Sequence, residues 1–94
     1  MARFLIEVSH ADEAAECARA AETFLRTGSH FLTRADWGCM DGDHRAWIIV
    51  EVGSKDEARN IVPSGFRSQA RVVRLNSFTM EQVEELRRHH GSNL

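Results

Sequence analysis

The sequence predicts an α+β protein in which a four-stranded antiparallel sheet carries two helices on one side. Segments that alternate apolar and polar residues, typical of strands, are interspersed with segments whose apolar residues recur at helical spacing. The chain has 94 residues, 43% of them hydrophobic, which is enough for one core and too few for two. We therefore expect a single domain over residues 1–94 with the order strand, helix, strand, strand, helix, strand and a further helix.

The first strand and the first helix follow from a change of periodicity. Residues 3–9 alternate between apolar and polar side chains and predict a strand. From Asp12 the apolar residues recur at helical spacing, and Gly28 is typical of a left-handed helix end. Cys17 falls on the apolar stripe of this helix, so we expect it in the core.

Two further strands are predicted in the middle of the chain. Residues 30–37 have extended character, and the pair Asp41-Gly42 that follows favours a tight hairpin connection. Residues 45–52 are rich in β-branched and aromatic side chains, which indicates a central strand.

The last part of the chain carries two helix-start signals. Ser54 begins a helix by a capping box with Glu57, and Pro63 soon follows that helix. Residues 71–75 predict the fourth strand. A second capping box begins the final helix, which we expect to end at Gly91; its members are Thr79 and Gln82.

This order of elements leaves one face of the sheet without a helix. Right-handed crossovers place both main helices on the same side. The alternation of the strands sends Leu5, Trp47 and Ile49 to the uncovered side, where they form an apolar patch. Because an apolar patch is unfavourable in water, we expect a second copy of the chain to cover it.

The pattern resembles the ferredoxin-like domains that pair sheet to sheet as dimeric α+β barrels. The resemblance covers nearly the whole chain. Residues 30–39, 44–52 and 79–86 also resemble small bacterial members of that superfamily. It implies a homodimer with a pocket between sheet and helices or between subunits. The superfamily includes small monooxygenases and muconolactone isomerases, so the resemblance does not imply one reaction.

Composition and charge exclude several classes of function. Twelve Lys and Arg residues balance 14 Asp and Glu residues, and Glu7 and Glu51 lie on the open face, so we expect no nucleic-acid partner. No segment approaches the roughly 18–20 apolar residues that cross a bilayer, and the amino terminus has no signal-peptide core. We therefore expect a cytoplasmic protein without a membrane partner. The two cysteines lack CxxC spacing, so free thiols are expected.

Several side chains suit acid–base chemistry on a small, anionic organic molecule. His10 or His30 would be the base and Asp36 would orient it; these two histidines are the expected pair, since the first helix begins beside one and ends before the other. This interpretation is a cofactor-independent isomerase, lyase or monooxygenase. Arg34 and Arg74 would anchor a carboxylate, although cross-strand ion pairs explain such arginines equally well. The expected pocket walls are Trp37 and Trp47.

A non-catalytic module that holds a metal ion or a ligand is the alternative, and a purely structural dimer is a third hypothesis. The spacing of the competent ligands matches no recognised metal motif, so no metal is assigned from the sequence. Whether His10 lies beside His44 depends on strand direction, which the sequence leaves open. The competent ligands are His10, His30, Asp36, Cys39 and His44.

Overall fold

The computed structural model describes residues 1–90 and centres its sheet on β1 (Ala2–Ser9). Strand β1 pairs in antiparallel fashion with β3 (Arg45–Val52) on one edge and with β4 (Ala70–Leu75) on the other. The short β2 (Asp36–Trp37) pairs with the free edge of β3, which gives the order β2-β3-β1-β4. The prediction of an α+β protein with a four-stranded antiparallel sheet is confirmed for these residues.

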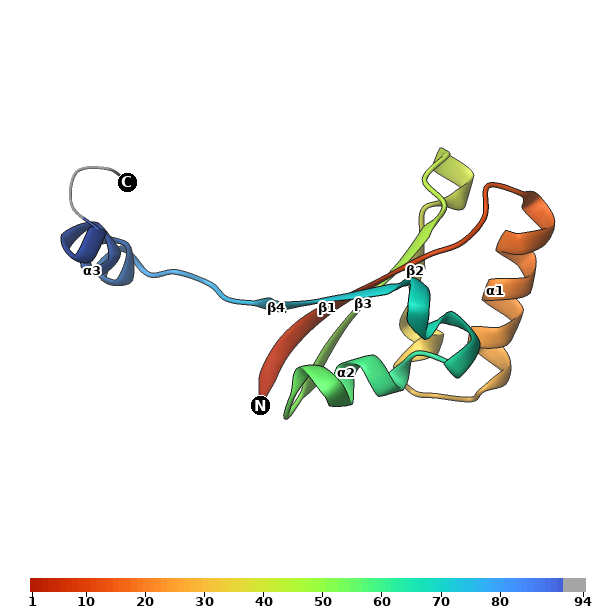
Figure 1. Ribbon diagram of the computed structural model, residues 1–94, viewed down its shortest axis with the longest axis horizontal. Helices are drawn as coiled ribbons and strands as arrows, with labels where there is room; N and C mark the ends of the chain where they lie inside the picture. Colours follow the sequence, from red (N-terminus) through yellow and green to blue (C-terminus); the bar gives the residue numbers. More distant parts are fainter. Residues whose placement is uncertain (91–94) are drawn as a thin grey trace.

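Two helices lie on the same side of the sheet, and a third stands apart from it (Figure 1). Helix α1 (Ala14–Arg26) follows β1, and α2 (Lys55–Ile61) follows β3. Helix α3 (Met80–His90) is held away from the sheet by an extended segment after β4 (Figure 1). Its expected end at Gly91 lies outside the described residues. Short 3₁₀ helices occupy Leu32–Arg34, Cys39–Asp41 and Ser64–Gln69.

The core lies between the sheet and the first two helices. Every second residue of β1 and β3 is buried, as the alternation predicts. Phe24 from α1 and Ala58 from α2 pack in the same cluster as these strand residues. On the other face a stripe of apolar side chains crosses three strands, because Leu5 pairs with both Ile49 and Val73. Ile49 is 62% exposed, so the uncovered face is apolar along this stripe.

Both predicted capping boxes are present. The Ser54 hydroxyl accepts a hydrogen bond from the Glu57 amide at 3.1 Å, and the Glu57 carboxylate accepts one from the Gly53 amide at 3.0 Å. At α3 the Gln82 amide donates to the Thr79 hydroxyl at 3.1 Å, and the Thr79 amide donates to the Gln82 side chain at 2.8 Å. These contacts satisfy amides that the first turn of a helix leaves unpaired.

The expected strand over residues 30–37 is wrong for most of its length. Only Asp36 and Trp37 pair with β3, and the preceding residues form a turn and a 3₁₀ helix. The cause is local: the Ser29 hydroxyl accepts hydrogen bonds from the Phe31 amide at 3.2 Å and the Leu32 amide at 3.4 Å. A serine that captures nearby amides in this way competes with the hydrogen bonds of a sheet.

The expected tight hairpin at Asp41-Gly42 is also wrong. Residues 38–44 form a broader loop, in which a 3₁₀ turn precedes Gly42 in the left-handed conformation at φ 84°. Gly38 begins this loop under close packing, since a Cβ there would lie 2.7 Å from the Asp43 carbonyl oxygen and 2.8 Å from the Trp47 ring. The loop turns the chain back over the end of β1, and this return places Cys39 beside His10.

Candidate functional site

Two histidines meet at the end of the sheet where β1 stops and β3 begins. Because the strands are antiparallel, Ser9 pairs with Arg45, and the His10 amide donates to the His44 carbonyl oxygen at 3.1 Å. Their imidazole rings lie edge to face with centroids 5.5 Å apart. The question of strand direction is therefore answered: His10 and His44 are neighbours.

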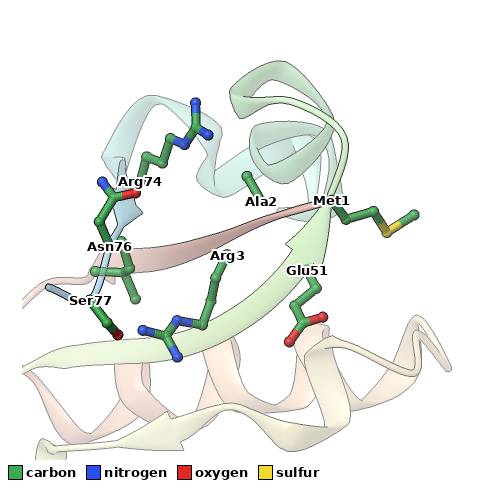
Figure 2. A pocket seen from close by; sticks show the side chains of 8 residues that line it. Met1, Ala2, Arg3, Glu51, Arg74, Asn76 and Ser77 are labelled. Carbon is green, nitrogen blue, oxygen red and sulfur yellow. The ribbon is translucent and has the colours of Figure 1, made fainter. Parts of the chain in front are cut away.

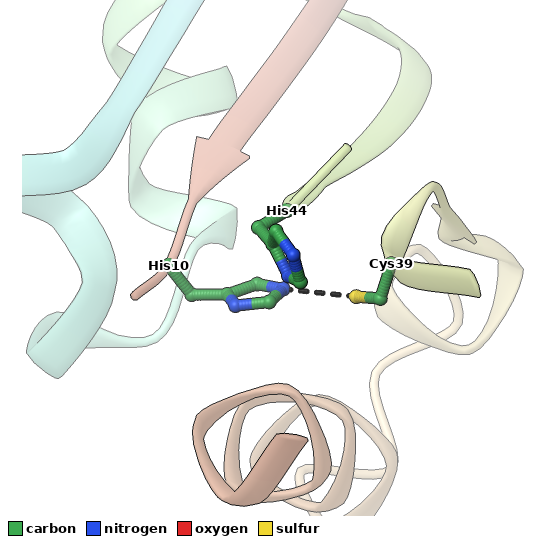
Figure 3. Close-up of side chains that lie close together, drawn as sticks. All are labelled: His10, Cys39 and His44. Atoms are coloured by element: carbon green, nitrogen blue, oxygen red, sulfur yellow. Dashed lines mark hydrogen bonds between the residues drawn. The ribbon is translucent and has the colours of Figure 1, made fainter. Parts of the chain in front are cut away.

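Cys39 joins this pair from the loop (Figure 3). Its Sγ lies 3.0 Å from Nε2 of His10. One ligand atom from each of His10, Cys39 and His44 lies within 4.8 Å of the other two, and all three residues are partly buried. We call these three residues the His-Cys-His cluster.

The backbone holds the His10 ring in one tautomer. Nδ1 of His10 lies 3.0 Å from the Ala11 carbonyl oxygen. A carbonyl oxygen only accepts, so Nδ1 carries the proton and donates it. In the neutral ring Nε2 is then left with a lone pair, which faces the thiol of Cys39.

A carboxylate orients the His44 ring in a similar way. Nε2 of His44 lies 2.7 Å from Oδ1 of Asp12, so Nε2 carries the proton. Nδ1 of His44 is buried and has no hydrogen-bond partner among the described residues. Burying an unpaired acceptor costs about 1–3 kcal/mol, so the fold keeps this nitrogen free at a cost.

The thiol of Cys39 is held in its protonated form. Burial, followed by a hydrogen bond with the thiol of Cys17, raises the pKa of Cys39 from 9.0 to about 11. The neutral Sγ–H therefore has a proton to donate to Nε2 of His10. A thiol nucleophile needs a lowered pKa, so this environment does not favour Cys39 as a nucleophile.

Cys17 is not the core residue that the helical stripe suggested. It is only partly buried, and its thiol lies close enough to that of Cys39 to raise the pKa of Cys39. Both cysteines are free thiols in the part of the chain that the structure describes, as expected. They share a hollow of about 360 Å³ with an otherwise apolar lining and one imidazole; the lining is Ala14, Cys17, Ala18, Ala21, Cys39, Met40 and His44.

The two tryptophans expected as pocket walls lie on opposite faces of the sheet. The centroid of the Trp37 ring lies 5.0 Å from that of the Phe24 ring and 6.1 Å from that of the His10 ring. Trp37 therefore packs beside the His-Cys-His cluster. Trp47 lies on the open face, where its indole donates to the Glu7 carboxylate at 3.2 Å. Only Trp37 therefore neighbours the cluster.

His30 and Arg34 belong to a different part of the molecule. They line a hollow of about 270 Å³ together with Ile49 and Glu51 of β3. These β3 residues lie about 16–23 Å from His44 along the strand, at roughly 3.3 Å per residue. The structure therefore does not bring the expected pair of His10 and His30 together.

The remaining predicted residues are also dispersed. Asp36 pairs with Trp47 and so lies on the open face, on the other side of the sheet from His10. Arg74 lines a hollow of about 370 Å³ near the start of β1, far from the cluster (Figure 2). There it points away from Arg3 and Glu51, because it pairs with the inward-facing Phe4 (Figure 2). The residues assigned to acid–base chemistry and to ligand anchoring thus do not form one site.

Sequence reasoning found the three members of the cluster among five competent ligands, but it missed Asp12 and Cys17. Asp12 follows His10 by only two residues, and this spacing could have predicted a carboxylate near the histidines. Cys17 lies in the first half of the helix that begins beside His10, so helix direction alone places it near that end of the sheet.

The comparisons with known proteins assign no family. No family model, no curated protein and no solved structure matches the chain. Within residues 1–90, none of the helices has the length and apolar character that crossing a bilayer requires.

Proposed function

We propose that the protein binds a late first-row transition-metal ion, with zinc the best fit, through Nε2 of His10, Sγ of Cys39 and Nδ1 of His44. Imidazole and thiolate ligands suit zinc and copper, whereas magnesium and calcium prefer oxygen. This is the metal-binding alternative of the sequence analysis, now limited to three of its five candidate ligands.

The unpartnered Nδ1 of His44 carries the proposal. Its ring is oriented by a carboxylate on the opposite nitrogen, which is the arrangement that metal-ligating histidines commonly show. The His10 ring is oriented in the same sense by a backbone carbonyl. Both lone pairs are therefore available before any ion binds, and the protein needs no tautomer change.

The spacing of the cluster fits a tetrahedral ion after a small adjustment. Zinc bonds of about 2.0–2.3 Å at tetrahedral angles separate neighbouring ligand atoms by about 3.3–3.8 Å. The pair His10 Nε2 and Cys39 Sγ is at 3.0 Å, and one ligand atom from each of the three residues lies within 4.8 Å of the other two. Binding replaces the thiol proton by the ion, so it releases a proton.

Zinc titration of untagged, chelator-treated protein tests the proposal. We expect one zinc ion per chain, and we expect His44→Ala to weaken the affinity by more than 100-fold, because it removes a direct ligand. His30→Ala is the matched control, since His30 is an exposed histidine away from the cluster, and it should leave the affinity unchanged. Binding that is absent from the parent protein, or equal in the parent and His44→Ala, would contradict the proposal.

We also propose that the fold is ferredoxin-like and that two copies associate through the open face. The strand order β2-β3-β1-β4 and two helices on one side agree with a β-α-β-β-α-β chain that has right-handed crossovers. The exposed apolar stripe and the separate α3 supply surface for a second copy. Association is independent of the metal proposal, because the His-Cys-His cluster lies on the opposite side of the sheet.

A further inference from the structure

We propose that Cys17 supplies the fourth ligand, so that the metal is held by two thiolates and two imidazoles. This inference rests on the proposed metal site and adds to it a residue from a different element. The ion would then connect the end of β1, the loop after β2, the start of β3 and helix α1.

The two thiols already interact. The thiol of Cys17 is one of the causes of the raised pKa of Cys39, so the two thiols are neighbours. Cys17 and Cys39 also line the same hollow as His44. Sγ of Cys39 is 3.0 Å from Nε2 of His10, so Cys39 connects this hollow to the His-Cys-His cluster.

Cys17 still has to move inward. It does not belong to the set of three residues whose ligand atoms all lie within 4.8 Å of one another. A cysteine on a helix has more than one staggered χ1 position, and the hollow of about 360 Å³ beside it gives the sulfur space.

A fourth protein ligand changes what the site can do. Catalytic zinc sites keep one position open for water or substrate, whereas four protein ligands close the coordination shell. Two thiolates and two imidazoles form such a closed set. The bound ion would therefore stabilise the fold rather than activate water, and its affinity would depend on both thiols remaining reduced.

Cobalt(II) substitution counts the thiolates directly. The near-ultraviolet thiolate-to-cobalt charge-transfer absorption grows with the number of bound sulfurs, and the visible bands report tetrahedral geometry. We expect Cys17→Ala to bind cobalt with half of the parent charge-transfer intensity. Ala18→Ser is the control, because Ala18 lines the same hollow on the same helix, and it should keep the full intensity. Circular dichroism of each metal-free variant checks its folding.

The outcomes separate this inference from the proposed function. Equal charge-transfer intensity in the parent and Cys17→Ala would overturn the role of Cys17 and leave the three-residue site in place. Absence of cobalt binding in the parent would overturn both. Should Cys17→Ala unfold, Cys17→Ser replaces it, since serine keeps a hydrogen-bonding group and lacks the thiolate; it too should show half of the parent intensity.

Discussion

At the scale of single residues, the main finding is that Nδ1 of His44 is buried and has no hydrogen-bond partner within residues 1–90. Asp12 accepts the proton of Nε2 and so determines which nitrogen of His44 stays free. Asp12 itself is 88% exposed, so its value to stability as a surface ion pair is small. Its position is better explained by orientation of the ring.

Asp12→Ala is expected to weaken zinc binding without abolishing it. Loss of a hydrogen-bond partner behind a metal ligand typically costs about 10–100-fold in affinity, and the exposure of Asp12 favours the lower end of that range. Competition with a chromophoric chelator measures the change. Asp56→Ala removes an exposed carboxylate on α2 and serves as the control. Equal affinities for Asp12→Ala and the parent would show that Asp12 does not orient the ligand.

The thiol of Cys39 predicts a pH dependence of stability in the metal-free protein. Its pKa rises from 9.0 to about 11 on folding, so the folded state holds the proton more tightly than the unfolded chain does. The associated stability is fully present below pH 9 and is lost as the pH rises towards 11.

Urea unfolding with a chelator present checks this dependence. The test compares the free energy of unfolding at about pH 8.5 and about pH 10.5, which is roughly the range over which a free thiol titrates. The fall in this free energy should be smaller for Cys39→Ala than for the parent protein. Identical slopes in the two proteins would show that Cys39 does not titrate differently in the folded state.

At the scale of elements, the loop of residues 38–44 decides whether the cluster exists. It replaces a tight hairpin and carries Cys39 back over the end of β1. Its first residue, Gly38, packs without a side chain between a carbonyl oxygen and the Trp47 ring. The loop therefore links the open face to the His-Cys-His cluster on the other side of the sheet.

Gly38→Ala is expected to destabilise the protein by about 1–3 kcal/mol, the usual cost of overpacking, because a Cβ there would overlap two neighbours. It should also weaken zinc binding by displacing Cys39. Thermal unfolding and zinc titration measure the two effects. Gly65→Ala is the control, since a Cβ at Gly65 meets no atom within 4 Å. A Gly38→Ala variant as stable as Gly65→Ala would contradict the packing argument.

At the scale of the whole molecule, two surfaces point away from the core. The open face carries the stripe of Ile49, Leu5 and Val73, and α3 projects beyond the sheet (Figure 1). On α3 the exposed Met80 and Leu86 add apolar surface that the rest of the described chain does not cover. Association of two copies would bury both surfaces, which is the physical basis for the proposed homodimer.

Ile49→Asp is expected to shift the protein from dimer to monomer, because it places a charge on the most exposed residue of the apolar stripe. Sedimentation equilibrium from low to high micromolar concentration measures the shift. Leu25→Asp is the control: Leu25 is as exposed as Ile49, at 61% and 62%, but it lies on α1, away from the open face. A monomeric parent protein at high micromolar concentration would contradict the proposal.

How much of the structure the sequence predicts depends on how far apart in the sequence the interacting residues lie. Capping at Ser54 and Thr79 was predictable because the two members of each box are only three positions apart in the sequence. Residues 30–37 were misassigned because apolar character alone does not show that Ser29 captures the following amides. His10 and Cys39 are 29 residues apart, and no local pattern relates them.

The sequence by itself therefore determined three of the four strands, the helices, the capping boxes of α2 and α3 and the α+β class, since these depend on patterns within a few residues. The tertiary structure alone decided that His10, Cys39 and His44 form a cluster, with Asp12 behind it and Cys17 beside it. Antiparallel pairing and one loop conformation create that proximity. Both depend on how distant segments pack together.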